Sequence, residues 1–261
     1  MKITLLATLL LAVFAAPAMA QTAAPTDAAA VPASPFTGNV SLASEYIYRG
    51  IAQTNRKPAI QGGFDYTHSS GLYVGVWASN ISWLSDVPGN SSSIEIDAYG
   101  GFKNTFGGGD FNYDVGVLTY NYPGSYVAGF TKADTQEVYG ALGWKWLSVK
   151  YSYVFSKNIF GWVGTNGEKT RGSDYLELNA NYDLGEGWGL LGHVGHQKIK
   201  HLSDASYTDY RVGVTKDIGF GVIGLSYWDT DAKGDVGQPY HNTHNKDLGK
   251  GVALLSFSKT F

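Results

Sequence analysis

Hydrophobic and polar residues alternate along this chain with a period of two. The alternation is clearest in residues 36–49, and it resumes in residues 58–66 after a short polar connection. This period predicts extended strands with one apolar face and one polar face. On the first strand, the residues expected to share the apolar face include Val40, Leu42, Tyr46 and Tyr48.

Twelve segments carry this strand pattern. They are expected at residues 36–49, 58–68, 72–79, 93–103, 110–120, 136–145, 147–156, 174–183, 188–197, 207–216, 220–228 and 248–261. Boundaries drawn from such patterns are accurate to a few residues.

The connections between these segments alternate in length. Long ones are expected at 50–57, 80–92, 121–135, 157–173, 198–206 and 229–247, and short ones at 69–71, 104–109, near Trp146, 184–187 and 217–219. Long loops at one end and short turns at the other are typical of membrane β-barrels, whereas a soluble sandwich has no reason to sort its loops in this way. We therefore expect an all-β fold, a closed up-and-down antiparallel transmembrane β-barrel of about twelve strands. The apolar face of the first strand would then contact lipid.

Aromatic residues and the last strand support this interpretation. Tyrosine and tryptophan number 18 and 7 in the 261 residues, and they are concentrated near predicted strand ends, as in the two aromatic girdles of membrane barrels. The alternating apolar residues that lead to Phe261 are similar to the C-terminal signature by which the assembly machinery recognises outer-membrane proteins.

The N-terminus has the features of an export signal. Lys2 precedes an apolar run, and Ala18-Met19-Ala20 fits a cleavage site. We divide the chain into a signal peptide at 1–20, a flexible periplasmic segment at 21–35 and an outer-membrane barrel domain at 36–261. Cleavage changes the formal charge from −3 to −4, with 18 basic against 22 acidic residues. This mild acidity argues against a nucleic-acid partner, and the absence of cysteine excludes disulfides and thiolate chemistry.

Residues 40–53, VSLASEYIYRGIAQ, resemble the opening signature of the TorF-like porins, a family of proteobacterial outer-membrane proteins. Residues 58–62 (PAIQG) and 68–75 (HSSGLYVG) fit the same pattern. The resemblance extends from about Phe36 to the C-terminus. It implies a barrel in the outer membrane of a Gram-negative bacterium and leaves the solute unspecified.

The charged residues expected on the polar faces would line the pore. Acidic residues outnumber basic ones by eight to five, which predicts weak selectivity for cations. The acidic residues are Glu45, Asp65, Glu95, Asp97, Asp114, Glu137, Glu177 and Asp209, and the basic residues are Arg49, Lys103, Lys145, Lys150 and Arg211.

Arg49 permits two interpretations at the outer mouth. It would either face carboxylates such as Glu95, Asp97 or Glu137 across a constriction, where the transverse field orders polar solutes, or have a structural role. In that role it would neutralise a carboxylate inside a narrow barrel or close the hairpin by bonding loop carbonyls. The sequence leaves both open.

Sites for metals and for catalysis find little support. His241, His244 and Asp247 have metal-ligand spacing, but solvated loop histidines are much more common. The acidic run that begins at Asp229 has Tyr240 where a calcium loop requires a glutamate. No G-x-S-x-G or H-E-x-x-H motif occurs. We expect no cofactor, no metal and no enzymatic activity.

The sequence thus predicts a porin through which small polar or charged solutes diffuse. Its expected partners are outer-membrane lipid and lipopolysaccharide, the barrel-assembly machinery through Phe261, and the solutes themselves. Two alternatives remain: a plugged structural barrel that presents its long loops as a receptor or adhesin, and an outer-membrane hydrolase.

Overall fold

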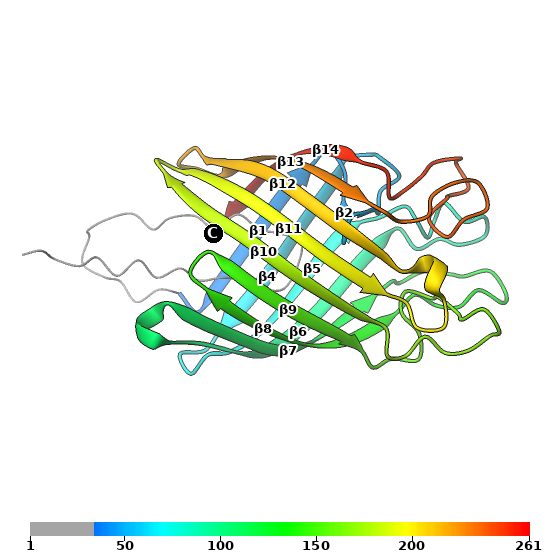
Figure 1. Cartoon of the computed structure of the whole chain (residues 1–261), viewed down its shortest axis with the longest axis horizontal. Coiled ribbons are helices and arrows are strands. Elements are labelled where there is room, and N and C mark those ends of the chain that lie inside the picture. The colour runs from blue at the N-terminus through cyan, green and yellow to red at the C-terminus, as the bar shows by residue number, and fades with distance from the viewer. Residues whose placement is uncertain (1–33) are drawn as a thin grey trace, which may run out of the picture.

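The computed structural model describes residues 34–261, which form a closed antiparallel barrel of twelve strands (Figure 1). Strands that follow one another in sequence pair with each other around the wall, and β1 closes the barrel by pairing with both β14 and β4. The predicted fold is confirmed. The predicted signal peptide, and residues 21–33 of the predicted periplasmic segment, lie outside the described residues.

The barrel strands run from end to end with few interruptions, and a two-stranded hairpin, β2–β3, lies apart from them. Two short 3-10 helices, η1 (Gly107–Gly109) and η2 (Ser203–Ala205), occur in connections. No helix among residues 34–261 is long and apolar enough to cross a membrane. The strands are β1 (Phe36–Ala43), β2 (Ile47–Tyr48), β3 (Ile51–Ala52), β4 (Ala59–Thr67), β5 (Leu72–Asn80), β6 (Ile94–Phe106), β7 (Phe111–Asn121), β8 (Thr135–Trp144), β9 (Leu147–Val154), β10 (Asp174–Gly185), β11 (Trp188–Lys198), β12 (Tyr207–Asp217), β13 (Val222–Thr230) and β14 (Val252–Thr260).

The two ends of the barrel differ as the loop lengths predict. The short turns and the C-terminus lie at one end, here called the turn end, and the long loops lie at the other, the loop end (Figure 1). The long loops comprise residues 44–58, 81–93, 122–134, 155–173, 199–206 and 231–251.

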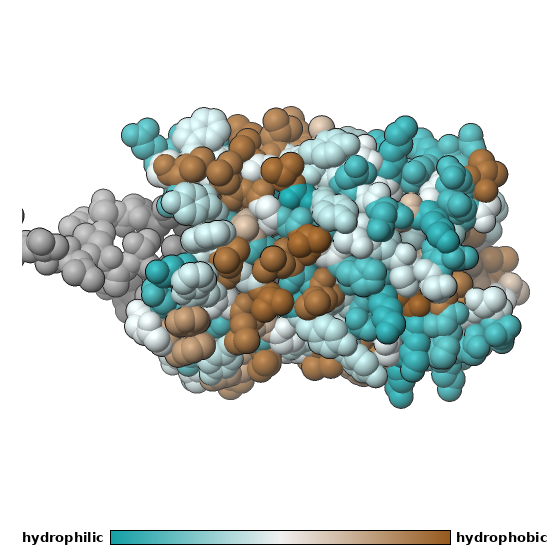
Figure 2. All heavy atoms as spheres, in the orientation of Figure 1, coloured by the Kyte–Doolittle hydropathy of each residue, from teal (hydrophilic) through white to brown (hydrophobic). Residues whose placement is uncertain are grey.

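The wall alternates between an apolar outer face and a more polar inner face. On β5, Leu72, Val74 and Val76 are at least half exposed, whereas Tyr73 and Trp77, at the alternate positions, are buried. Figure 2 shows hydrophobic side chains over the middle of the barrel and towards the turn end, and hydrophilic side chains gathered at the loop end. Because successive side chains of a strand point to opposite sides, this pattern gives the barrel an apolar belt and a polar interior.

The first strand is shorter than predicted. The strand pairing of β1 ends at Ala43, opposite Ala59 of β4, and the chain then turns into the barrel. Leu42 is exposed on the outer face as predicted, but the prediction that Tyr46 and Tyr48 contact lipid is wrong, since both rings pack inside the barrel. Alternation alone cannot separate an aromatic side chain that faces lipid from one buried in the lumen.

The hairpin β2–β3 forms the tip of this inward segment. Tyr48 pairs with Ile51, and the two residues between them, Arg49 and Gly50, have positive φ angles of 46° and 78°. Positive φ at both central residues is the geometry of a type I′ hairpin turn, which matches the twist of the flanking strands. Residues 44–58 are called the inner loop below.

Candidate pore interior

The inner loop crosses the lumen from one wall to the other. It leaves β1 and returns through β4, which are neighbours, whereas its tip contacts β8, β11 and β12. In the strand order of the barrel these three strands lie on the far side from β1 and β4. The loop therefore narrows the barrel near its loop end.

Arg49 at the tip holds the hairpin to the far wall. Its guanidinium donates to both carboxylate oxygens of Glu137, at 3.0 and 2.7 Å, and to the side-chain oxygen of Gln197, at 2.7 Å. The guanidinium carbon also lies 4.9 and 4.2 Å from the ring centres of Tyr48 and Tyr175. The side chains of Arg49 and Glu137 are only 8% and 1% exposed, so this is a buried, bidentate ion pair.

Tyrosine hydroxyls also fix the hairpin to β6 and β7, which follow β8 in the strand order of the wall. Tyr46 donates to Glu95 of β6 at 3.1 Å, and the hydroxyl of Tyr48 lies 2.6 Å from that of Tyr120 on β7. A methyl group placed on Gly50 would lie 2.6 Å from the Cβ of Asp209, so only glycine permits this approach. The tip is thus held from several directions.

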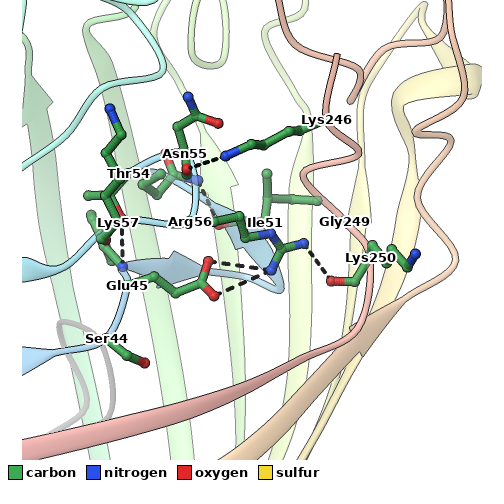
Figure 3. Close-up of polar contacts among 12 residues, drawn as sticks. Ser44, Glu45, Ile51, Thr54, Asn55, Arg56, Lys57, Lys246, Gly249 and Lys250 are labelled. Atoms are coloured by element: carbon green, nitrogen blue, oxygen red, sulfur yellow. Dashed lines mark hydrogen bonds and ion pairs between the residues drawn. The ribbon is translucent and has the colours of Figure 1, made fainter. Parts of the chain in front are cut away.

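A second set of contacts ties the base of the inner loop to loop 231–251 (Figure 3). Arg56 pairs with Glu45 at 3.3 Å and donates to the backbone carbonyl of Lys250 at 2.6 Å. Lys246 donates to the backbone carbonyl of Asn55 at 3.1 Å. Burial raises the pKa of Glu45, and the charge of Arg56 offsets part of this rise. The inner loop is therefore anchored at its base as well as at its tip.

Bulky side chains fill the inner wall of strands β4 to β8. The hydroxyl of Tyr73 donates to Asp114 at 2.6 Å and contacts the hydroxyl of Tyr139. Tyr99 donates to Asp65 at 2.6 Å. These aromatic rings occupy space in the lumen and fix the two carboxylates by hydrogen bonds.

Strands β10 to β12 carry a polar cluster around His193. Its Nε2 lies 2.9 Å from Asp209 and its Nδ1 lies 2.7 Å from Asn179 and 3.7 Å from Glu177. Tyr175 donates to Asp209 at 2.9 Å. Every polar partner in this cluster belongs to the wall, which indicates a fixed lining rather than a set of mobile charges.

Arg211 contrasts with Arg49 and Arg56, which form ion pairs inside the barrel. Its guanidinium carbon lies 5.1 Å from the ring centre of Trp228, its cross-strand neighbour. Within residues 34–261 no ion pair includes Arg211, and its buried Nε has no hydrogen-bond partner. It is a positive charge inside the barrel without a counter-charge at ion-pair distance.

The structure places nearly all of the predicted pore-lining residues inside the barrel. Lys145 is the exception, and the prediction that it faces the lumen is wrong. Lys145 lies in the turn between β8 and β9, with a φ of 53°, where its half-exposed side chain pairs with Asp110 at 3.8 Å. The alternation of side chains stops where a turn begins, so it does not predict the direction of the Lys145 side chain. Located inside the barrel are Glu45, Arg49, Asp65, Glu95, Asp97, Lys103, Asp114, Glu137, Lys150, Glu177, Asp209 and Arg211.

Sequence reasoning missed several residues that shape the interior. Gln197 and Tyr175 contact Arg49, and Arg56 of the inner loop contacts Glu45 and Lys250. Arg56 belongs to the polar connection expected at residues 50–57, and no sequence pattern indicates that such a connection folds into the barrel. Gln197 does alternate with outward residues on its strand, which was the one available signal.

A cavity of about 370 Å³ lies at the loop end, on top of the inner loop. Tyr48, Ile51 and Gln53 contribute its floor, and the other long loops contribute its sides. The lining thus combines residues of the hairpin with residues of the other long loops.

The candidate metal ligands of the last loop do not converge. His241 contacts the backbone carbonyl of Gly234, His244 contacts Asp86, and Asp247 accepts a hydrogen bond from the backbone of Gly249. Across residues 34–261, no three His, Cys, Asp or Glu side chains are grouped so that they could hold a metal ion.

A closed twelve-stranded barrel with an apolar belt, a polar interior and an inward-folded loop has the fold of the porins. The family model "Bacterial protein of unknown function (Gcw_chp)" matches residues 28–261, and the chain belongs to this family. The match does not address the resemblance to the TorF-like porins. No curated protein matches the chain.

Two solved porin structures are similar to the barrel in fold. The KdgM porin is 8% identical, with a TM-score of 0.52 over 86% of this chain and 98% of that one. The NanC porin is 9% identical, with a TM-score of 0.53 over 86% and 98% of the two chains. At such low identity the likeness establishes the architecture.

Proposed function

We propose that the protein is an outer-membrane porin through which small polar or charged solutes diffuse past the inner loop. The observation that carries the proposal is that the closed wall has apolar side chains on its outer face and charged side chains on its inner face. An apolar belt of this kind suits contact with lipid, and ionisable side chains on the inner face suit water and polar solutes. The barrel acts as a channel in this proposal and carries out no reaction.

The comparisons and the sequence support the same conclusion. KdgM and NanC are porins, and nearly their whole length is covered by the similar fold. The resemblance of residues 40–53 to the TorF-like porins favours the same role. Phe261 is 70% exposed at the turn end, where the barrel-assembly machinery would recognise it. We place the protein, with its signal peptide removed, among the lipids and lipopolysaccharide of the outer membrane.

Conductance in a planar lipid bilayer tests the proposal. The purified chain is expected to produce discrete conductance steps, small because the inner loop occupies much of the cross-section. Release of small sugars from proteoliposomes extends the test to uncharged solutes. Absence of both activities, in protein shown to be folded and inserted, would refute the porin function.

One observation favours a second candidate, a plugged structural barrel. The inner loop is anchored at its tip by Arg49 and at its base by Arg56, and such anchoring suits a permanent plug. The long loops would then serve as a receptor or adhesin surface. A variant without the Arg49 anchor separates the two candidates: if it too lacks conductance, the barrel is structural.

A further inference from the structure

The cavity above the inner loop is amphipathic. Aromatic side chains surround much of it, and they come from different loops that meet only in the folded barrel. Trp83 packs edge-on against Tyr122, and Trp162 packs edge-on against Tyr240, with ring centres 5.5 and 5.8 Å apart. Edge-to-face contacts hold the rings in place. The cavity therefore offers several fixed aromatic surfaces to one solute.

Polar side chains also belong to the lining of this cavity. Gln53 of the inner loop, Asp86 of loop 81–93, and Asn242 and Thr243 of loop 231–251 line it. These groups present amide, carboxylate and hydroxyl functions that pair with ligand hydroxyl groups. A ligand that suits both the aromatic and the polar side chains has an apolar face and a rim of hydrogen-bonding groups.

The charge of the lining restricts the ligand further. No lysine or arginine lines the cavity, and Asp86, its one carboxylate, already pairs with His244 at 3.1 Å. An anionic ligand would lose its hydration there without gaining a cationic partner. The cavity thus favours a neutral ligand.

We propose that this cavity binds a neutral saccharide of one or two rings before it passes the inner loop. A pyranose has C–H faces that stack on aromatic rings and hydroxyl groups around its edge, which matches the aromatic and polar side chains of the lining. The volume of about 370 Å³ is at the small end of ligand pockets, and this limits the saccharide to one or two rings. As a substrate class for the channel, the proposal rests on the porin function; as a binding site, it can be tested alone.

A neutral planar aromatic compound fits the same cavity less well. It would stack on the rings, but it offers few hydroxyl groups to Asn242, Thr243 and Gln53. These side chains retain hydrogen-bonding capacity beyond their bonds within the protein. The polar side chains of the lining therefore distinguish the two classes of ligand. The experiment below includes both.

Ligand titration of the full-length mature protein in detergent tests the site. Maltose is the probe, glucuronate is the anionic comparison and indole is the aromatic one. Because Trp83 and Trp162 line the cavity, maltose is expected to change tryptophan fluorescence saturably, with heat measurable by calorimetry. Glucuronate and indole are expected to bind at least about tenfold more weakly, which corresponds to 1.4 kcal/mol.

Matched variants connect binding to the cavity. Trp162→Ala is expected to weaken maltose binding about tenfold, and Trp162→Phe is expected to restore most of it, because the aromatic face returns. Trp144→Phe is the control, since Trp144 is 45% exposed on the outer face of β8. Heat-modifiable electrophoretic mobility verifies that each variant is folded.

Several outcomes would overturn the inference. They are saturable binding of indole with none of maltose, no maltose binding by any method, or unchanged affinity in folded Trp162→Ala. If the protein conducts ions but fails to bind maltose, the saccharide site is wrong and the porin function stands. If it binds maltose without conducting, the site stands and the porin function is wrong.

Discussion

Removal of Arg49 tests whether the inner loop controls passage through the barrel. In Arg49→Ala, Glu137 keeps its charge at a position where its side chain is 1% exposed, and it loses both bonds of the bidentate pair. Loss of one partner of a buried ion pair costs about 3–5 kcal/mol, because the other charge stays buried and unpaired. Gln197 loses a bond as well.

This loss of stabilisation affects the hairpin and leaves the barrel wall intact. The other attachments of the hairpin are individually weaker. They include the hydroxyls of Tyr46 and Tyr48, the bond from the backbone N–H of Ala52 to the carbonyl of Leu248, and the packing of buried side chains. A hydrogen bond contributes only about 0.5–1.5 kcal/mol net. The strand ladders of the barrel do not include Arg49. We therefore expect the hairpin to leave the far wall while the barrel stays folded.

The assay is single-channel conductance in a planar bilayer, together with protease digestion of the inner loop in the folded barrel. Arg49→Ala is expected to raise the conductance several-fold and to expose the loop to cleavage. Lys145→Ala is the matched control. Its pair with Asp110 is 3.8 Å long and half exposed, so its loss costs about 0–1 kcal/mol and leaves the lumen unchanged.

A double-mutant cycle separates the ion pair from other effects. Adding Glu137→Ala to Arg49→Ala removes the unpaired charge, so the double variant is expected to be more stable than Arg49→Ala alone. Both Arg49→Ala and the double variant should have a high conductance, since neither variant has the Arg49 anchor. The reasoning fails if Arg49→Ala keeps the conductance and protease resistance of the unchanged protein.

Three further predictions concern single residues of the interior. Gly50→Val is expected to displace the hairpin, because a side chain at this position with φ of 78° meets Asp209; cleavage of the inner loop by protease measures this, and resistance equal to the unchanged protein would contradict it. Burial raises the pKa of Glu45 above 4.5, so docking of the inner loop favours the protonated form and is most stable below that pH. Docking should weaken as pH rises through the raised pKa, and Glu45→Gln should abolish this pH dependence of protease resistance; a slope retained in Glu45→Gln would assign it to another group. Arg211→Gln is expected to shift the reversal potential under a salt gradient towards cation selectivity, because it removes a positive charge with no counter-charge; an unchanged potential would show that ions do not pass near Arg211.

Strand positions and loop lengths were predictable from the sequence because they follow from local chemistry. A wall with lipid-like surroundings on one side must alternate along every strand, as Leu72 and Tyr73 do on β5. Turns at one end require few residues, so their shortness was visible as well. The number of strands and the alternation of long and short connections can therefore be predicted from short stretches of the sequence.

The inner loop was not predictable for the opposite reason. Its position depends on partners that are distant in sequence: Arg49 and Gln197 are 148 residues apart, and Arg56 contacts Lys250 across 194. Tyr46 continues the alternation of the strand before it, so its local pattern is the same whether it faces lipid or the lumen. Only strand register decides which residues face one another inside the barrel.

The pairing of charges inside the barrel changes how they should be counted. Eight acidic and five basic residues suggested weak cation selectivity, but charges that are paired contribute little to the field that a passing ion meets. Glu137 is neutralised by Arg49 and Glu45 is paired with Arg56, whereas Arg211 is unpaired. Selectivity thus depends on which charges lack a partner beside the open path. Acidic residues contribute to cation selectivity only where the carboxylate is still partly exposed, as at Glu177.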